Sequence, residues 1–351
     1  MKKRTLAIAA LAASAMLAAC SNATQDPLAN EESGAAAGDH VFGEDETLIG
    51  GSLFTLQYAW FLGAQQGMEQ WGEEHPDANV RFQFEDSQQD IQTNIQNLEN
   101  LVAAGAQGIV VFPTDSTAII PTMVDLHGRE GTQFVVGDYP QEPSTPEDAV
   151  WNTFVGHDMV ALGEVAGQVA VEHLQAENIE DPTIVYISVP TSGEASAARL
   201  EGFTDTVLAE YPDATIIDEG DTGAADRNSA QDLMANVLQR EDSIDVVAGH
   251  NDAEVLGAYN AAVGAGRAEE MGFVGIGGDR EVLQYIQDGN PSWLGEVLQD
   301  PVELGYTAMD ALWQSMAEGE DLPEQTELPE PEAITPDTID DTDWQSWDWI
   351  G

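Results

Sequence analysis

Short apolar runs alternate along this chain with longer segments whose apolar residues recur every three or four positions. Phe61, Ala64, Met68 and Trp71 show the helical spacing. The short runs have the length and the β-branched content of buried strands. Apolar strands that alternate with amphipathic helices are typical of βαβ units, whose parallel sheets are covered by helices on both faces.

The pattern divides into two similar blocks. The first predicts helices over 59–74 and 90–105, and strands over 47–53, 80–84, 108–112, 133–137 and 153–155. The second predicts helices over 194–211, 229–240, 253–264, 281–287 and 302–317, and strands over 183–188, 215–217, 246–248, 273–276 and 294–298. We therefore expect an α/β protein with two doubly wound parallel-sheet lobes.

In such sheets, ligands bind at the carboxyl ends of the strands, so the loops that follow strands are the candidate binding segments. Polar and aromatic residues gather in these loops, at 55–61, 112–116, 137–140, 191–199, 249–252 and 299–301. Aromatic faces suit the C–H faces of a sugar, and Asp and Arg side chains suit its hydroxyl groups. The loops thus indicate a carbohydrate-like ligand.

Several of these loops carry motifs that resemble, in order and spacing over residues 47 to 340, the periplasmic ribose-binding-protein family, the type I substrate-binding proteins of sugar ABC transporters. The motifs are Pro113-Thr114-Asp115-Ser116, Ser196-Ala197-Ala198-Arg199 with Glu201-Gly202-Phe203, Asn251-Asp252 with Leu256-Gly257-Ala258, and Val274-Gly275-Ile276-Gly277. The resemblance implies two lobes joined by a hinge, with the sugar in the cleft. The implied lobes are 47–156 plus 300–330 and 157–299 plus 331–340, followed by a Trp-rich acidic tail over 341–351.

The resemblance also implies the ligand contacts. Trp60 and Phe61 match the two aromatic positions that sandwich the sugar ring, and Asp138 matches the carboxylate that accepts its hydroxyls. Arg199 matches the family's binding arginine, Asn251 matches its asparagine, and Gln299 matches its hinge glutamine.

Other positions depart from the family. Tyr58 stands where ribose binders have Asn, and Tyr139 stands where Arg is usual. The third aromatic position falls at Ala225, and a late Asp falls at Gly277, with Asp279 two residues on. These departures, together with Phe112, indicate a ligand other than ribose itself.

Structural explanations compete with ligand contact at several of these positions. Trp60 and Phe61 open a helix and could pack in the core, Asp138 could cap a turn, and Arg199 could form a surface ion pair. For other polar residues we expect purely structural roles: an ion pair for Arg227, turn hydrogen bonds for Asp115, a surface turn for Arg267, and loop polar groups for His157 and His250. No His, Cys or Asp spacing resembles a metal site.

The single cysteine, Cys20, closes the run Leu17-Ala18-Ala19-Cys20. Lys2, Lys3 and Arg4 and an apolar stretch over 6–19 precede it, which is the pattern of a signal peptide over 1–19. A cysteine directly after small residues predicts a bacterial lipoprotein, with Cys20 lipidated and 20–46 forming an acidic tether to the membrane. The alternative is a free cysteine that happens to follow a signal peptide.

The charge of the chain excludes some partners. Its 351 residues hold 64 Asp and Glu against 10 Lys and Arg, and three of those ten precede Cys20, which leaves seven arginines and a net charge of −57. Such a surface repels phosphate backbones, which excludes nucleic acid as a partner. It also repels itself unless salt screens it, which favours a halophilic source. The alternative is an exported protein that is merely acidic, or one whose acidity lies in its tails.

We therefore expect a lipid-anchored extracellular solute-binding protein that captures a sugar or polyol by hinge closure and delivers it to an ABC permease. It would act as a monomer without a cofactor and without catalysis, since no catalytic triad, metal site or phosphate loop is evident. The main alternative is a sensory receptor that presents a sugar-like signal, such as a furanosyl autoinducer, to a membrane kinase. The sequence leaves open whether Trp344, Trp347 and Trp349 pack against the hinge, bind a partner or stay mobile.

Overall fold

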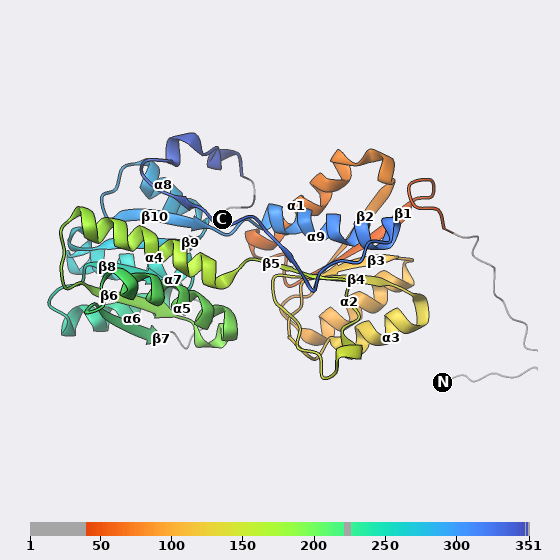
Figure 1. Ribbon diagram of the computed structural model, residues 1–351, viewed down its shortest axis with the longest axis horizontal. Coiled ribbons are helices and arrows are strands. Elements are labelled where there is room, and N and C mark those ends of the chain that lie inside the picture. Colours follow the sequence, from red (N-terminus) through yellow and green to blue (C-terminus); the bar gives the residue numbers. More distant parts are fainter. Residues whose placement is uncertain (1–39, 221–225, 348, 350–351) are drawn as a thin grey trace, which may run out of the picture. The chain divides into compact units, whose positions relative to one another are not determined.

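Two parallel sheets, each covered by helices, form the body of the protein (Figure 1). The computed structural model describes residues 40–220, 226–347 and 349, and residues from Val41 onward belong to one compact unit. The predicted signal peptide, Cys20 and Ala225 lie outside the described residues.

The first sheet has the strand order β11-β5-β4-β3-β1-β2, and every pair in it is parallel. Its strands are β1 (Thr47–Leu53), β2 (Val80–Asp86), β3 (Gly108–Val111), β4 (Gln133–Gly137), β5 (Phe154–Gly156) and β11 (Gln325–Glu327). Helices α1 (Ala59–Glu74) and α9 (Pro301–Trp313) cover one face, and α2 (Ile91–Ala103) and α3 (Ile120–Glu130) cover the other. Every residue of β1 is buried, as expected for a central strand with helices on both faces.

The second sheet has the order β12-β10-β9-β8-β6-β7 and is parallel except for the antiparallel edge strand β12. Its strands are β6 (Thr183–Ser188), β7 (Thr215–Gly220), β8 (Val246–Gly249), β9 (Gly272–Gly277), β10 (Trp293–Leu298) and β12 (Ala333–Ile334). Helices α4 (Met159–Ala176) and α5 (Gly193–Glu210) cover one face. The other face carries α6 (Arg227–Arg240), α7 (Asp252–Ala265) and α8 (Arg280–Gln287).

The predicted fold class is confirmed: the chain forms two α/β lobes, which we call the first and second lobe after their sheets. The sequence pattern missed helices α3 and α4 and strand β11. Helix α4 approaches α5 closely at two glycines, beside apolar side chains such as Leu162, Ala166 and Phe203. A Cβ at Gly163 would overlap the Arg199 carbonyl, and one at Gly202 would overlap the Val160 carbonyl.

The C-terminal tryptophans, whose role the sequence left open, pack on the folded body. Trp344 and Trp349 are buried in the core formed by α6, α7 and α8. Trp344 Nε1 donates a hydrogen bond to Gln287 Oε1 at 3.3 Å, and Trp347 and Trp349 stack on each other. Trp349 also lies against Gly63 of α1 and Gly278 of the second lobe. The tail segment is thus part of the second lobe's core.

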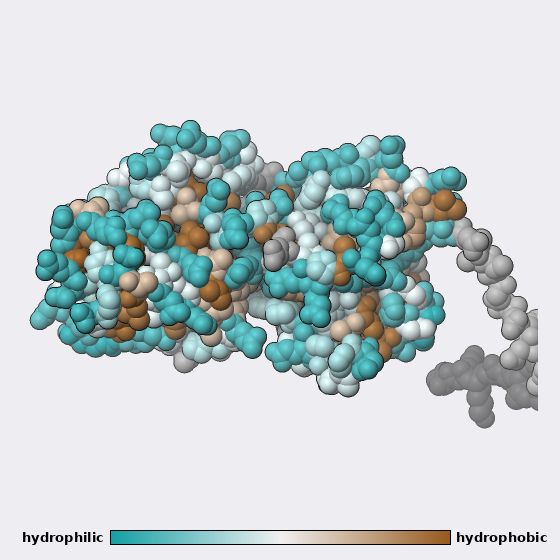
Figure 2. Space-filling view, viewed as in Figure 1, coloured by the Kyte–Doolittle hydropathy of each residue, from teal (hydrophilic) through white to brown (hydrophobic). Residues whose placement is uncertain are grey.

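The surface seen in Figure 2 is mostly hydrophilic on both lobes, with apolar residues scattered over it. None of the helices in the described ranges is long and apolar enough to cross a membrane.

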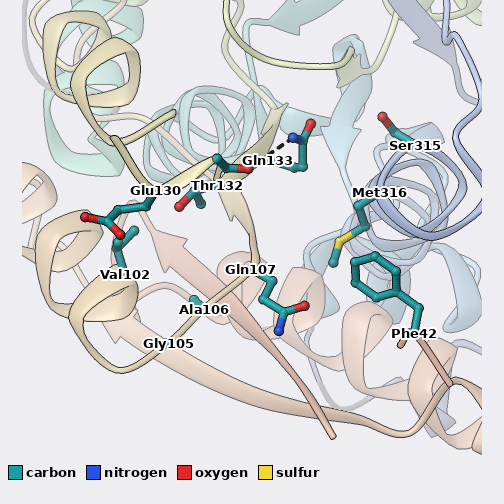
Figure 3. A pocket seen from close by; sticks show the side chains of 11 residues that line it. Phe42, Val102, Gly105, Ala106, Gln107, Glu130, Thr132, Gln133, Ser315 and Met316 are labelled. Carbon is teal, nitrogen blue, oxygen red and sulfur yellow. Dashed lines mark hydrogen bonds between the residues drawn. The ribbon is translucent and has the colours of Figure 1, made fainter. Parts of the chain in front are cut away.

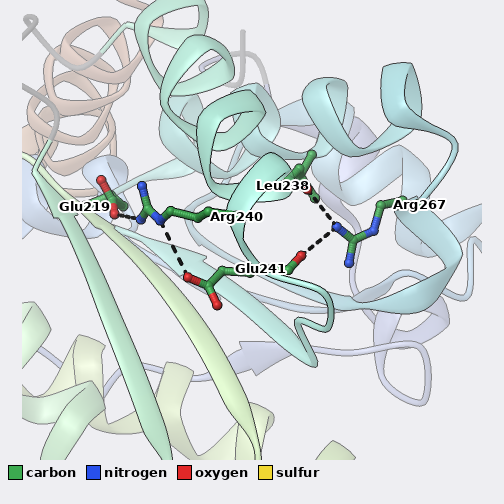
Figure 4. A network of polar contacts seen from close by, with 5 residues as sticks. All are labelled: Glu219, Leu238, Arg240, Glu241 and Arg267. Carbon is green, nitrogen blue, oxygen red and sulfur yellow. Dashed lines mark hydrogen bonds and ion pairs between the residues drawn. The ribbon is translucent and has the colours of Figure 1, made fainter.

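Arg267 is not the loose surface residue that its turn position predicted. Its guanidinium donates hydrogen bonds to the carbonyls of Leu238, Glu241 and Asp242, each at 3.0 Å, and pairs with Glu270 at 2.7 Å. Figure 4 shows it beside the ion pairs of Arg240 with Glu219 and Glu241. Only 17% of the Arg267 side chain is exposed, so it closes the carboxyl end of α6.

Replacing this arginine should destabilise the second lobe. We expect Arg267→Ala to lower the free energy of unfolding by about 1–3 kcal/mol, because the carbonyls at the end of α6 lose a charged donor. Arg129→Ala is the matched control, since Arg129 pairs with Asp125 on the exposed surface of α3. Such an exposed pair contributes about 0.5 kcal/mol or less. Urea denaturation of both variants measures the difference, and equal midpoints would contradict a structural role for Arg267.

Candidate ligand-binding site

A cavity of about 390 Å³ lies where the segments after seven strands meet. The strands are β1, β4, β5, β6, β8, β9 and β10, and each contributes residues beyond its carboxyl end. All nine residues expected to contact the ligand line this cavity, namely Tyr58, Trp60, Phe61, Asp138, Tyr139, Arg199, Asn251, Asp279 and Gln299. The fold therefore brings together residues that are spread over most of the chain.

A second cavity, of about 520 Å³, lies at the opposite, amino-terminal edge of the first sheet (Figure 3). Gln107 and Gln133 mark that edge, and Phe42 and Met316 lie side by side on its far wall. Among the described residues that line it, Glu130 is the only charged one. Because this edge holds the starts of the strands, it lacks the converging loops of a ligand site in an open α/β sheet.

The two adjacent aromatic residues present different surfaces. Their rings are nearly perpendicular, with an interplanar angle of 83°. Phe61 is buried and stacks on Phe54 in the core of the first lobe, as the competing core explanation predicted, while it also lines the cavity. Trp60 is half-buried, and its Nε1 donates a hydrogen bond to the Gln299 carbonyl at 3.1 Å. This bond ties α1 to the segment where the chain leaves β10.

Asp138 follows β4 in the left-handed region, with φ of 69°, which is uncommon for a residue other than glycine. Its side chain is 7% exposed and lines the cavity. No hydrogen bond or ion pair to its carboxylate occurs within the described ranges, so the explanation of Asp138 as a turn cap is wrong. Burial raises the pKa of Asp138 to about 7, against the opposing effect of the Arg199 charge. Its charge in turn raises the pKa of the neighbouring Tyr139 to about 12.

Arg199 is a buried arginine held by neutral acceptors. It is 3% exposed, and it donates to the His250 carbonyl at 2.6 Å and to Gln299 Oε1 at 2.8 Å. In the part of the chain that the structure describes, no carboxylate lies within ion-pair distance of it, so the surface ion pair considered for this residue is wrong. Arg199 Nε has no partner. The guanidinium therefore keeps hydrogen-bonding capacity for a ligand.

His157 and His250 are more buried than their loop positions suggested. Burial, and then the nearby Arg199 charge, lower the pKa of each to about 3. Both are therefore neutral near pH 7. His250 lines the cavity, which the sequence analysis did not anticipate. Among the residues described, no group of three or more His, Cys, Asp or Glu could hold a metal ion.

Two other structural expectations agree with the structure. Arg227 pairs with Glu281 at 2.6 Å, joining α6 to α8. Asp115 accepts hydrogen bonds from the backbone N–H groups of Thr117 and Ala118.

The second-lobe wall of the cavity is organised by Asp252, whose buried side chain the sequence analysis did not single out. Its Oδ2 accepts hydrogen bonds from the backbone N–H groups of Gly278 at 3.0 Å and Asp279 at 2.9 Å. Asn251, just before it, caps α7 through a reciprocal capping box with Glu254. A Cβ at Gly277 would overlap the Asp252 carboxylate, so glycine at that position makes room for it.

Glu296 of β10 lies directly behind Asp252. It is fully buried, and its carboxyl group forms a hydrogen bond with the carboxyl group of Asp252. A Cβ at Gly275 would overlap Glu296 Oε2 and would lie 2.6 Å from Asp252 Oδ1, so both carboxyl groups converge on this glycine. Burial and the Asp252 charge raise the pKa of Glu296 well above its usual range, and burial with the Asp279 charge raises that of Asp252 to about 6. The pair thus holds at least one proton near neutral pH.

This pair predicts a specific pH dependence of stability. The unfolded chain releases the Glu296 proton near pH 4.5 whereas the folded chain retains it, so the pair costs stability as pH rises above that value. Glu296→Gln removes this cost. Its melting temperature relative to the parent should therefore increase between about pH 4 and pH 8.

Glu99→Gln, on the exposed face of α2, is the matched control. Its melting temperature should differ from that of the parent by the same small amount at every pH. A melting-temperature difference for Glu296→Gln that does not change with pH would contradict the shared proton.

Other residues line the cavity that the sequence analysis did not predict as ligand contacts. They are Met159, Ala195, His250, Asp252, Ala253, Ile276 and Gly277. His250 and Asp252 stand in a loop that the sequence marked as a candidate segment, but only the fold shows that their side chains are buried there. Met159 and Ala195 carry no chemical signal in the sequence.

The fold and the cavity define a type I periplasmic binding protein. Residues 49–321 match the family described as periplasmic binding protein domain, and since this is most of the chain, the protein belongs to that family. The resemblance to ribose-binding proteins of sugar ABC transporters is confirmed.

Curated relatives agree with this family. The chain is 27% identical over 308 residues to the xylitol-binding protein of Mycolicibacterium smegmatis, covering 87% of this chain and 81% of the relative. It is 26% identical over 266 residues to the ribose import binding protein RbsB of Bacillus subtilis, covering 76% and 80%.

Solved structures show the same fold. A periplasmic ribose ABC transporter protein from Conexibacter woesei superposes with a TM-score of 0.73 at 19% identity, covering 84% of this chain and 94% of that one. A solute-binding protein from Actinobacillus succinogenes with bound D-allose gives 0.71 at 20% identity, covering 84% and 100%.

Proposed function

We propose that this protein binds a sugar or polyol in the cavity lined by Asp138 and Arg199 and delivers it to an ABC permease. The observation that carries this function is the unpartnered hydrogen-bonding capacity of two buried, charged side chains in one cavity. Arg199 is 3% exposed and its Nε has no partner, while Asp138 is 7% exposed and its carboxylate takes part in no hydrogen bond or ion pair with the described residues. Buried polar groups of this kind cost stability unless something satisfies them, and a polyhydroxylated ligand supplies both donors and acceptors.

The remaining lining suits the same ligand. Trp60 offers an aromatic surface for C–H groups, and Tyr58 and Tyr139 place further rings at the cavity, where each is more than one-third exposed. Asp138 belongs to the first lobe and Arg199 to the second, so a ligand that contacts both favours the conformation in which the lobes hold it. Binding and release by hinge motion need no covalent step.

The relatives support this class of ligand. One is named for xylitol, another for ribose, and one of the similar structures holds D-allose. Three of the five positions that depart from ribose binders, Tyr58, Tyr139 and Gly277, line the cavity. The ligand is therefore a sugar or polyol other than ribose.

The first test is a thermal-shift screen against pentoses, hexoses and polyols, followed by calorimetric titration of the sugar it identifies. Asp138→Ala and Arg199→Ala should each weaken binding roughly tenfold to a hundredfold, because each removes a charged hydrogen bond to a buried hydroxyl. Trp60→Ala should also weaken binding through loss of its aromatic surface.

Asp138→Asn keeps the side-chain volume and guards against misfolding, and Arg129→Ala, on the exposed surface of α3, should bind like the parent. Folded Asp138 and Arg199 variants with parental affinity would place the binding site elsewhere.

We also propose that the protein is anchored to the membrane through a lipid on Cys20 and works as an exported monomer. The support is the charged and apolar segment before the Leu17-Ala18-Ala19-Cys20 run, together with the absence of any other cysteine from the sequence. The strong acidity of the chain suits a saline environment, where screening reduces self-repulsion.

Cys20→Ser should move the protein from the membrane fraction to the soluble fraction, because the serine hydroxyl does not replace the thiol that carries the lipid. Immunoblots of fractionated cells measure the partition, with Arg129→Ala as a control that stays in the membrane fraction. Equal membrane partitioning of Cys20→Ser and the parent would argue against a lipid anchor.

A further inference from the structure

The last tryptophan of the tail segment lies across both lobes. Trp349 is 5% exposed, and its indole fills the space that two glycines leave. A Cβ at Gly63 of α1 would lie 2.8 Å from Trp349 Cβ, and one at Gly278 would lie 2.9 Å from Trp349 Cη2, at the far edge of the ring. The indole therefore reaches from a helix of the first lobe to a loop of the second lobe.

The tail segment is fixed to α8 of the second lobe. Trp344 Nε1 donates to Gln287 Oε1 at 3.3 Å, and the Arg280 guanidinium lies 5.8 Å from the centre of the Trp344 ring. Arg280 Nη2 also donates to the Trp347 carbonyl at 3.0 Å. The Trp347 and Trp349 rings stack, with centroids 5.3 Å apart and an interplanar angle of 13°. These contacts hold the last tryptophan on the second lobe while its other end meets the first lobe.

Both glycines stand directly behind the walls of the binding cavity. Gly63 follows Trp60 by three residues, so the two occupy neighbouring positions on one face of α1. Gly278 lies between two residues that line the cavity. Trp60 itself packs against the hydrophobic cores of both lobes. Trp349 is not among the described residues that line the cavity, so it contacts these walls from outside.

The Trp349 contact depends on how the two lobes are arranged. An indole buried between two surfaces becomes exposed when those surfaces separate, which is unfavourable in water. The contact with Gly63 therefore stabilises the arrangement in which both lobes line the cavity. A sugar that bridges Asp138 and Arg199 stabilises the same arrangement, so the two interactions act in the same direction.

Building on the sugar-binding function, we propose that Trp349 is a positioning residue of the binding site. From outside the cavity, it holds α1, with Trp60, against the loop of Gly278. The free protein thereby keeps more molecules in the conformation that binds the ligand, so the ligand supplies less of the free energy of closure. Loss of Trp349 therefore weakens binding although this residue lies outside the cavity.

Distances between the lobes test this role directly. Spin labels on Glu99→Cys of α2 and Glu201→Cys of α5, both at exposed positions, report the place of one lobe relative to the other. A Cys20→Ser background makes the labelling specific, because the sequence has no other cysteine. In the free protein, double electron–electron resonance should give a longer mean distance for Trp349→Ala than for the parent. A saturating sugar should restore the parental distance, because the ligand itself contacts both lobes.

Gly63→Ala tests the same contact from the first lobe and leaves the tail segment intact. Its Cβ would overlap Trp349 and Pro301, so it should also lengthen the distance. In the Trp349→Ala background the same substitution should add little, since the contact is already lost. Val237→Ala controls for destabilisation, because it removes buried atoms from the second-lobe core and should leave the distance unchanged.

Calorimetric titration measures the effect on binding. Trp349→Ala should bind the sugar found in the screen roughly fivefold more weakly than the parent, because apparent affinity falls with the population of the binding conformation. Val237→Ala should bind this sugar like the parent.

The outcomes separate the two proposals. Parental distances in free Trp349→Ala and free Gly63→Ala would overturn the role of Trp349 and leave the sugar-binding function standing. An equal shift in Val237→Ala would also overturn it, since general destabilisation would then explain the change. If Trp349→Ala does not fold, Gly63→Ala alone decides. If the parent binds none of the screened sugars, the sugar-binding function fails, and the distances in the free protein still decide whether Trp349 couples the lobes.

Discussion

Parallel strand pairing is the constraint on which the rest of this structure depends. Because neighbouring strands run in the same direction, the loops that follow them all emerge at one edge of the sheet. In the first lobe this brings the segments after β1 and β4 together, and in the second lobe those after β6, β8 and β9. The opposite edge of the first sheet, where Gln107 and Gln133 lie, receives the strand starts and holds a cavity with little charge. The shared direction of the strands therefore decides at which edge of the sheet a polar binding site can form.

The charged groups of the cavity are held by neutral partners rather than by each other. Arg199 donates to a backbone carbonyl and to Gln299, and Asp138 has no side-chain partner in the described part of the chain. Pairing the two directly would satisfy both groups and leave little for a ligand. Keeping them apart costs stability through desolvation, since burial raises the pKa of Asp138 and lowers that of Arg199. A ligand that forms hydrogen bonds with Asp138 and Arg199 offsets this desolvation cost. The free protein therefore already holds both groups in position for binding.

The second-lobe wall shows how glycines permit this arrangement. Gly275 and Gly277 leave the space that the carboxyl groups of Glu296 and Asp252 fill, and Gly277 adopts a φ of 154°, which disfavours other residues. Asp252 then fixes the loop of Gly278 and Asp279 by accepting two backbone N–H groups. A side chain that carries charge thus also sets the backbone of the cavity wall, so its substitution would change geometry and charge together.

The sequence by itself determined the fold class, most of the helices and strands, and the loops that carry the site, because burial imposes a period on each element and strand ends carry the polar residues. It also placed Trp60, Asp138 and Arg199 in one candidate site, through their positions in ordered motifs. Only the tertiary structure decided that Glu296 meets Asp252, and that Trp344 and Trp349 join the second lobe's core. It also decided that Arg199 has no carboxylate partner among the described residues. The physical reason is that periodicity reports whether a position is buried, whereas the partner it meets depends on how distant elements pack. In the sequence, a glutamate in a buried strand is only an exception to the apolar pattern. Its role depends on Asp252, the carboxyl group that it meets in the folded chain.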